Sequence, residues 1–206
     1  MLPGMMPFAG LGASGTDGPG GEFVGSSHSS GTAFAGWPTG SVEGDLALIW
    51  KATFGGYFST AGWNNINVAS ATNCAGTLSW KVVTASDLAG TPSPGYSVGN
   101  NSCYVFRGAT SVALKTTSTS NSPTLAGFTK DAASLFVLSL MGTRNQISNV
   151  PTPTGWNDMG RGITSASHIT EGAYKASADY ANSETSTWTP TTGGQGGTVS
   201  AHVELT

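Results

Sequence analysis

The sequence predicts an all-β protein: an antiparallel, two-sheet β-sandwich of jelly-roll-like form with an extended N-terminal arm. Three features predict it, namely a degenerate internal repeat, a composition rich in turn residues, and apolar residues that alternate with polar ones. At 206 residues the chain is long enough for one sizeable β domain, because sandwiches and barrels commonly reach this length as a single unit.

A pattern of strand and turn residues occurs twice. Trp63 and Trp156 stand in two Gly-Trp-Asn triplets 93 positions apart (156 − 63), and Lys81 and Lys175 follow an aromatic residue in both cases. The matching segments, in order, are 45–50 and 134–139, 62–64 and 155–157, 80–81 and 174–175, and 103–106 and 199–203. We therefore predict a sandwich domain over 42–206, made of two copies at about 42–115 and 130–206.

The amino-acid composition favours a β-rich fold and argues against several classes of function. The 30 Gly, 10 Pro and a Ser plus Thr content of about a quarter favour short strands and many turns. Charged residues make up 9% of the chain, against about 25% in an average soluble domain, so the surface suits burial against partners. A net charge of −3 with scattered basic residues argues against nucleic acid, and no apolar stretch is long enough to predict a membrane span.

The first 41 residues form the predicted arm. They contain no Lys or Arg, are rich in Gly and Ser, show no sustained periodicity, and lack the basic start of a secretory signal. Each large apolar side chain that becomes buried contributes roughly 1.5–3 kcal/mol. The apolar tip can therefore act as an assembly anchor on a neighbouring subunit, or it can fold back on its own domain. Its residues are Met1, Leu2, Met5, Met6, Phe8 and Leu11.

The strand signals follow the arm. Segments 46–50 and 135–141 are almost continuously apolar and are predicted to be central strands. Segments 78–83 and 199–205 alternate, as half-buried antiparallel strands do. No segment of ten or more residues makes a convincing amphipathic helix.

Few residues of this sequence are candidates for covalent chemistry or metal binding. Cys74 and Cys103 could form a disulfide or be two small buried hydrophobes. His202 and Glu204 share a strand face, with His168 in the same half, but we expect a solvated face and no metal or cofactor.

Nor does the sequence predict an enzyme. His28 stands in a Ser-rich stretch that lacks the oriented acid and strained turn of a hydrolytic triad. The eleven acidic residues nominate no catalytic pair.

Aromatic residues in predicted loops offer a binding alternative. Trp37, Tyr57 and Trp188 could stack against sugar rings of a glycan. Trp63 and Trp156 hold equivalent places in the repeat, which favours a core role for them, because a binding site is more often unique to one copy.

Several motifs together resemble a β-sandwich module common in structural proteins of tailed bacteriophages. They are 44–46, 62–63, 80–84 with Asp87, and 104–108, and the resemblance covers about 42–206. It implies a virion protein, assembled in the host cytoplasm, without catalytic residues. Because no long shaft or heptad segment is present, a capsid decoration or stabilising protein is the expected type, and a tail-fibre or tail-tip module that binds a host glycan or receptor is the alternative. The implied partners are the major capsid protein or a tail or head-fibre protein, with a homo-oligomer such as a trimer.

Overall fold

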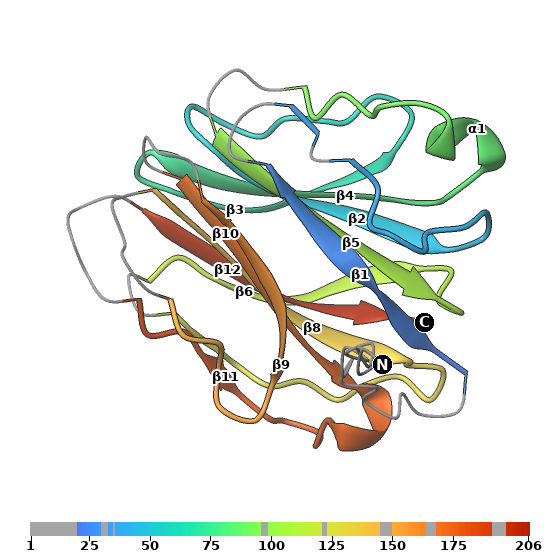
Figure 1. Ribbon diagram of the computed structural model, residues 1–206. Coiled ribbons are helices and arrows are strands. Elements are labelled where there is room, and N and C mark those ends of the chain that lie inside the picture. The colour runs from blue at the N-terminus through green and yellow to red at the C-terminus, as the bar shows by residue number, and fades with distance from the viewer. Residues whose placement is uncertain are drawn as a thin grey trace, which may run out of the picture.

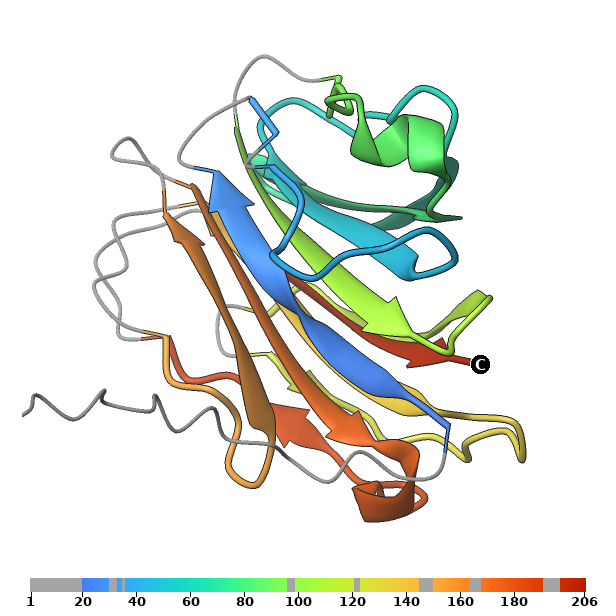
Figure 2. The ribbon, with the colours of Figure 1, turned by 45° about the vertical axis from the view of Figure 1, so that its right-hand side comes forward.

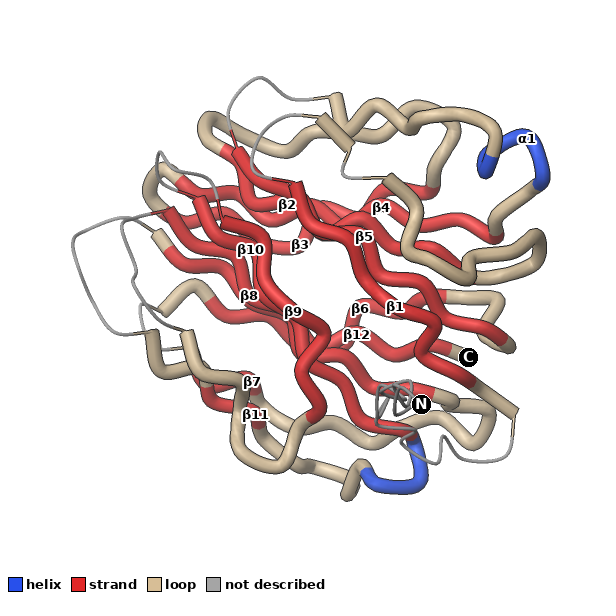
Figure 3. Tube along the Cα trace, in the orientation of Figure 1, coloured by secondary structure: helices blue, strands red, loops and turns tan. Residues whose placement is uncertain are grey.

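The computed structural model describes residues 20–206, except 30–32, 35, 96–98, 121–122, 145–149, 164–167 and 191–196. Within these residues two five-stranded antiparallel sheets face each other, and a short strand pair lies outside the second sheet (Figures 1 and 3). The all-β, two-sheet sandwich predicted from the sequence is confirmed. No helix in the described ranges is long and apolar enough to cross a membrane.

The first sheet has the order β1-β5-β2-β4-β3 and the second the order β6-β12-β8-β10-β9. The first contains β1 (Glu22–Ser29), β2 (Leu46–Thr53), β3 (Asn64–Ala71), β4 (Cys74–Val82) and β5 (Gly99–Arg107). The second contains β6 (Val112–Ser118), β8 (Phe136–Arg144), β9 (Asn157–Ile163), β10 (His168–Ala176) and β12 (Thr198–Leu205). The short elements are β7 (Thr124–Leu125), β11 (Ser186–Thr187), the helix α1 (Ala85–Leu88) and the 3-10 turn η1 (Ser177–Asp179).

Each copy of the sequence repeat supplies four strands of one sheet, and the fifth strand, β1 or β6, precedes the copy in the chain. Strand for strand, β1, β5, β2, β4 and β3 correspond to β6, β12, β8, β10 and β9. The sheets face each other so that β1 lies against β9 and β6 against β3, which makes the sandwich approximately two-fold symmetric. Figure 2 shows the blue strand β1 beside the orange strands of the second sheet. The connectivity is simpler than the jelly-roll-like one expected, because the chain completes the first sheet before it begins the second.

The two central strands are β2 and β8, as their apolar runs predicted. Every residue of β2 is buried, and in β8 only Arg144 is not. Their inward side chains form the main core between the sheets, where the Trp50 indole donates a hydrogen bond to the Met141 carbonyl oxygen at 2.9 Å. This bond joins the two sheets directly.

Both outer faces are also covered. Loops pack over Ala47, Ile49 and Val105 on the first sheet, and over Val137, Met141 and Ala173 on the second. This double covering explains why β2 and β8 are apolar on both faces and do not alternate.

The repeated Gly-Trp pair forms the same turn in both copies. Gly62 and Gly155 have φ of 77° and 80°, in the left-handed region that favours glycine. The Trp63 amide then donates to the Thr60 carbonyl at 3.2 Å, and the Trp156 amide donates to that of Pro153 at 3.1 Å. The motif is therefore repeated because the backbone of each turn requires it.

The extended arm expected over 1–41 is shorter than predicted, because Glu22–Ser29 form the edge strand β1. Their hydrogen bonds go to β5, and their side chains are mostly half-buried. An edge strand of this kind needs no apolar periodicity, which is why the sequence pattern did not reveal it.

Candidate functional site

The two repeated tryptophans lie against the outer faces of the two sheets. Trp63 is 9% exposed and Trp156 is 7% exposed, so the core role predicted for both is confirmed. The Lys81 ammonium lies 6.0 Å from the centre of the Trp63 ring, and the Lys175 ammonium lies 5.7 Å from that of Trp156. The equivalence of these contacts identifies them as parts of the shared fold.

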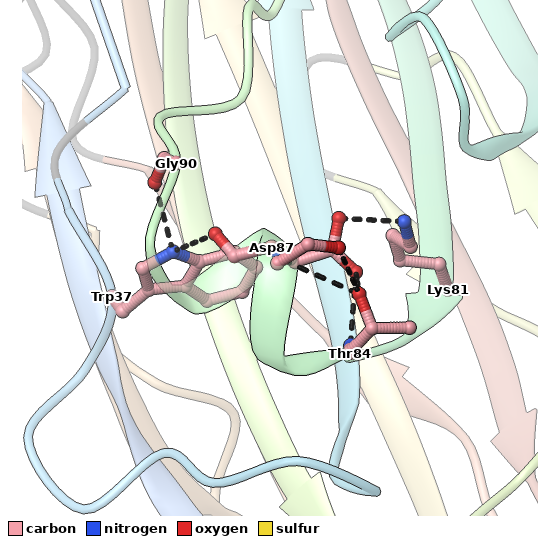
Figure 4. Close-up of polar contacts among 6 residues, drawn as sticks. Trp37, Lys81, Thr84, Asp87 and Gly90 are labelled. Atoms are coloured by element: carbon pink, nitrogen blue, oxygen red, sulfur yellow. Dashed lines mark hydrogen bonds and ion pairs between the residues drawn. The ribbon is translucent and has the colours of Figure 1, made fainter.

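The same two lysines form equivalent ion pairs with acidic residues of the loops. Lys81 binds Asp87 at 2.7 Å and Lys175 binds Glu184. Asp87 also caps α1 together with Thr84, each side chain accepting a hydrogen bond from the other residue's amide (Figure 4). The two acids therefore hold the covering loops on their sheets.

Trp37 does not offer a free ring. Its indole N–H points at the carbonyl oxygens of Asp87 and Gly90, at 3.0 and 3.3 Å (Figure 4). Its ring stacks on Trp63 with centroids 6.2 Å apart and planes 15° from parallel. Trp37 thus fastens the segment after β1 to the loop that contains α1.

The glycan role considered for Trp188 is wrong. This side chain is fully buried, and its indole N–H donates to the Ser139 hydroxyl oxygen at 2.9 Å. A sequence cannot distinguish a loop tryptophan that covers a sheet from one that faces solvent. Of the three candidates only Tyr57 is exposed, at 42%.

A polar cluster lies between the sheets: the sequence had drawn attention to His28, but not to its partners on other strands, Ser102 and Thr170. The His28 ring of β1 lies 2.8 Å from the Ser102 hydroxyl of β5 through Nδ1, and 3.1 Å from the Ser26 hydroxyl through Nε2. Ser102 also lies 2.6 Å from the Thr170 hydroxyl of β10. The cluster therefore connects three strands and joins the first sheet to the second.

This cluster is present in one half of the interface alone. In the matching register of the other half, Ser102 is replaced by Ala201 and Thr170 by Gly76. The nearby Asn100 is likewise replaced by Val199. The copies thus share a fold but differ in the chemistry between the sheets.

The chemistry open to the cluster is limited by burial. Burial lowers the pKa of His28, opposed by the Met159 backbone and by the charge of Asp158. Ser102 is fully buried, so a substrate could reach its hydroxyl only if the sheets separated. The arrangement suits a hydrogen-bonded link between the sheets better than a nucleophile.

The three residues weighed as possible metal ligands do not converge. His202 and Glu204 are on the outer face of β12, whereas His168 is on the inward side of β10, and no cluster of metal-ligating side chains occurs in the described ranges. The solvated face expected for His202 and Glu204 is also wrong, because both are fully buried. Trp156, Phe128 and Tyr180 surround the His202 ring, and Lys115 binds Glu204 at 2.6 Å.

Cys74 and Cys103 are free thiols, which leaves the small buried hydrophobe as their role. They lie on opposite faces of the first sheet, and β2 separates their strands. Burial raises the pKa of Cys74 to about 12, which keeps this thiol protonated.

The six apolar residues of the predicted anchor, from Met1 to Leu11, lie outside the described residues. The described chain begins beside a shallow hollow of about 310 Å³, lined by Gly21, residues 132–136, Ser177 and Ala178. A Cβ on Gly21 would lie 2.6 Å from the Phe136 ring, so the backbone is held closely at this point.

The edges of both sheets are irregular. Each of the four edge strands, β1, β3, β6 and β9, pairs with its neighbour through a shifted register, whereas the central pairs are regular. Bulges at edges oppose the addition of another strand. The sandwich is therefore poorly suited to lateral growth through its sheets.

In comparisons with known proteins, no family model, curated protein or solved structure matched this chain.

Proposed function

We propose that the protein is a structural subunit of a bacteriophage virion, of the capsid decoration or stabilising type, attached through its N-terminal segment. The observation that carries the proposal is the position at which that segment joins the sandwich. Residues 1–19 lead into Gly20 and Gly21, beside the 310 Å³ hollow and at the start of an edge strand. An extended chain of this length can reach roughly 60 Å, far enough to cross a subunit boundary.

The irregular edges support attachment through this segment. Because bulges oppose strand addition, a partner must engage either the segment or a loop surface. Six large apolar side chains within eleven residues offer enough buried surface to compensate for much of the entropy lost when the segment becomes ordered.

The placement of the charged groups supports a passive, associative role. Lys51 is buried and its ammonium donates to the hydroxyl of Thr60 at 3.0 Å, and Lys81 and Lys175 hold loops. Since these three ammonium groups are bound to oxygen atoms of the protein itself, we expect neutral hydroxyl and amide groups to meet the partner. Binding of this kind depends little on salt.

Deletion of residues 1–19 tests the proposal. We expect the truncated protein to retain its unfolding temperature, because β1 and both sheets remain, but to lose binding to the phage capsid in a sedimentation assay. The matched control is a full-length variant with Met1 retained and Leu2, Met5, Met6, Phe8 and Leu11 changed to Ser, which should lose binding equally. Full capsid binding by either variant would overturn the proposal.

A homo-oligomer such as a trimer on the virion is part of the same proposal. Sedimentation equilibrium of the full chain and of the truncated form separates self-association through the sandwich from self-association through the segment.

A further inference from the structure

The starting observation concerns the eight basic residues. Within the described residues, seven have the charged group bound to a carboxylate, carbonyl or hydroxyl oxygen, whereas the Arg144 guanidinium lies over an aromatic ring. The seven are Lys51, Lys81, Arg107, Lys115, Lys130, Arg161 and Lys175. The Arg144 guanidinium carbon lies 4.4 Å from the centre of the Phe54 ring.

Phe54 and Arg144 hold the same place in the two copies. In the matching register, Thr53 at the end of β2 corresponds to Thr143 of β8, so the next residues, Phe54 and Arg144, correspond to each other. They therefore meet across the approximate two-fold axis of the sandwich, at one end of its two central strands. At this pair of equivalent positions, one copy has an aromatic ring and the other has a cation.

Phe54 is also 42% exposed and lines a hollow of about 180 Å³. Gly55, Gly56, Ser70, Asn73 and Ala75 contribute to the lining. Pockets for drug-sized ligands usually begin at about 300 Å³, so this hollow has room for one ring-sized group. Gly55 and Gly56 have φ of 86° and 147°, and a Cβ at either position would meet no atom within 4 Å, which leaves bare backbone next to the ring.

Arg144 does not line the hollow itself, but its guanidinium lies over the ring of Phe54, which does. Burial and the charge of Arg144 lower the pKa of the adjacent His168 to about 4, so the imidazole is neutral at pH 7 and adds no second cation. A guanidinium stacked on an aromatic face keeps its in-plane N–H groups free for a carboxylate. One cation is too few for a polyphosphate, which argues for a ligand with an isolated carboxylate.

We propose that this end of the sandwich binds a carboxylated sugar unit, a hexuronic or sialic acid of a surface polysaccharide. The apolar face of the pyranose would lie against the face of the Phe54 ring opposite Arg144, and its carboxylate would reach past the ring edge to the guanidinium. Ser70 and Asn73 would provide hydroxyl and amide groups for the sugar hydroxyls. This site does not depend on the proposed attachment through the N-terminal segment.

The test is calorimetric titration of the full chain with tetragalacturonate and with an α2,8-linked sialic acid tetramer, against neutral tetragalactose and sodium acetate. We expect one acidic tetramer to bind and both controls to fail. If acetate bound as tightly as the tetramer, the site would recognise only an anion and the proposal of a sugar site would be overturned. Failure of both acidic tetramers to bind would refute it as well.

The variants Phe54→Ala, which removes the stacking ring, and Arg144→Gln, which removes the charged partner of the carboxylate, should each weaken that binding at least about tenfold. Arg144→Lys should recover part of the affinity, because the charge remains but the fork is lost. The control Val42→Ser alters another exposed apolar residue away from the hollow and should bind normally. Should a variant fail to fold, amide shifts of the wild-type protein decide: perturbation confined to Gly55, Gly56 and Asn73 supports the site, and perturbation elsewhere excludes it.

Discussion

The imidazole of His202 stacks on the indole of Trp156, with ring centroids 5.5 Å apart and planes 13° from parallel. The ring is fully buried, lies 2.7 Å from the Ser186 hydroxyl through Nε2, and lies 3.1 Å from the Ala126 carbonyl oxygen through Nδ1. Burial lowers the pKa of His202 to about 4 from an ordinary value of 6.5. A neutral histidine is thus built into the cover of the second sheet.

This histidine predicts a loss of stability in acid. Because its folded pKa lies below its unfolded one, the unfolded state binds more protons between pH 6.5 and 4, and stability falls as the pH is lowered through this range. Over this pH range the titration of His202 lowers the free energy of unfolding by about 3 kcal/mol. We expect urea unfolding of His202→Gln to show a shallower pH dependence than wild type. The pKa of His168 is similarly lowered, so this residue should account for the pH dependence that remains in the variant. An unchanged pH dependence would contradict the presence of a buried, neutral His202.

Glu171 predicts the opposite dependence at higher pH. Burial raises its pKa to about 8, although the charge of Arg161, 3.4 Å away, opposes the shift, and the charge of Asp158 adds to it. The folded state therefore binds more protons than the unfolded state between pH 4.5 and 8, and this carboxyl lowers stability as the pH rises. Glu171→Gln should remove this decline in unfolding experiments from pH 6 to 8.5. A wild-type protein equally stable at both ends of that range would argue against a protonated Glu171.

Trp188 and Tyr57 provide a matched pair of loop aromatics. Trp188→Ala should cost about 3–5 kcal/mol of unfolding free energy, because it removes a fully buried ring and its hydrogen bond to Ser139. Tyr57→Ala should change the unfolding free energy by no more than about 0.5 kcal/mol, since the side chain is largely exposed. Denaturant titration of both variants tests this, and similar losses in the two would show that exposure is not the deciding factor.

The link between the sheets can be tested by a double-mutant cycle. Ser102→Ala leaves His28 and Thr170 without their shared partner and should cost about 1–3 kcal/mol. Thr170→Val should cost less on its own, because Ser102 retains its contact with His28. The double variant should be more stable than the sum of the single effects predicts, and strict additivity would show that the two hydroxyls do not interact.

How far the sequence could predict the structure depended on the kind of feature. The continuous apolar runs of β2 and β8 and the repeated Gly-Trp turns are local, and they predicted the two central strands and the buried positions of Trp63 and Trp156. The strand β1 was missed because its partners in β5 lie 72 to 85 positions away in the chain (101 − 29 and 107 − 22), so the pairing leaves no local period.

The candidate sites were less predictable. His28 and Ser102 are far apart in the chain, and only the packing of β1 on β5 joins them. Phe54 and Arg144 meet only because the two sheets face each other. Trp188 and Tyr57 have similar surroundings in the sequence, and the path of the covering loops determines which of them reaches solvent.

An all-β sandwich of two repeated units, with low charge and with β2 and β8 at its centre, follows from the sequence alone, because periodicity, turn residues and composition act over short distances. The tertiary contacts determine which copy carries polar side chains between the sheets, which aromatics are buried, and where a cation meets an exposed ring. These properties depend on strands and loops that are distant in the chain, and burial cannot be assigned to a side chain until the segment that covers it is known.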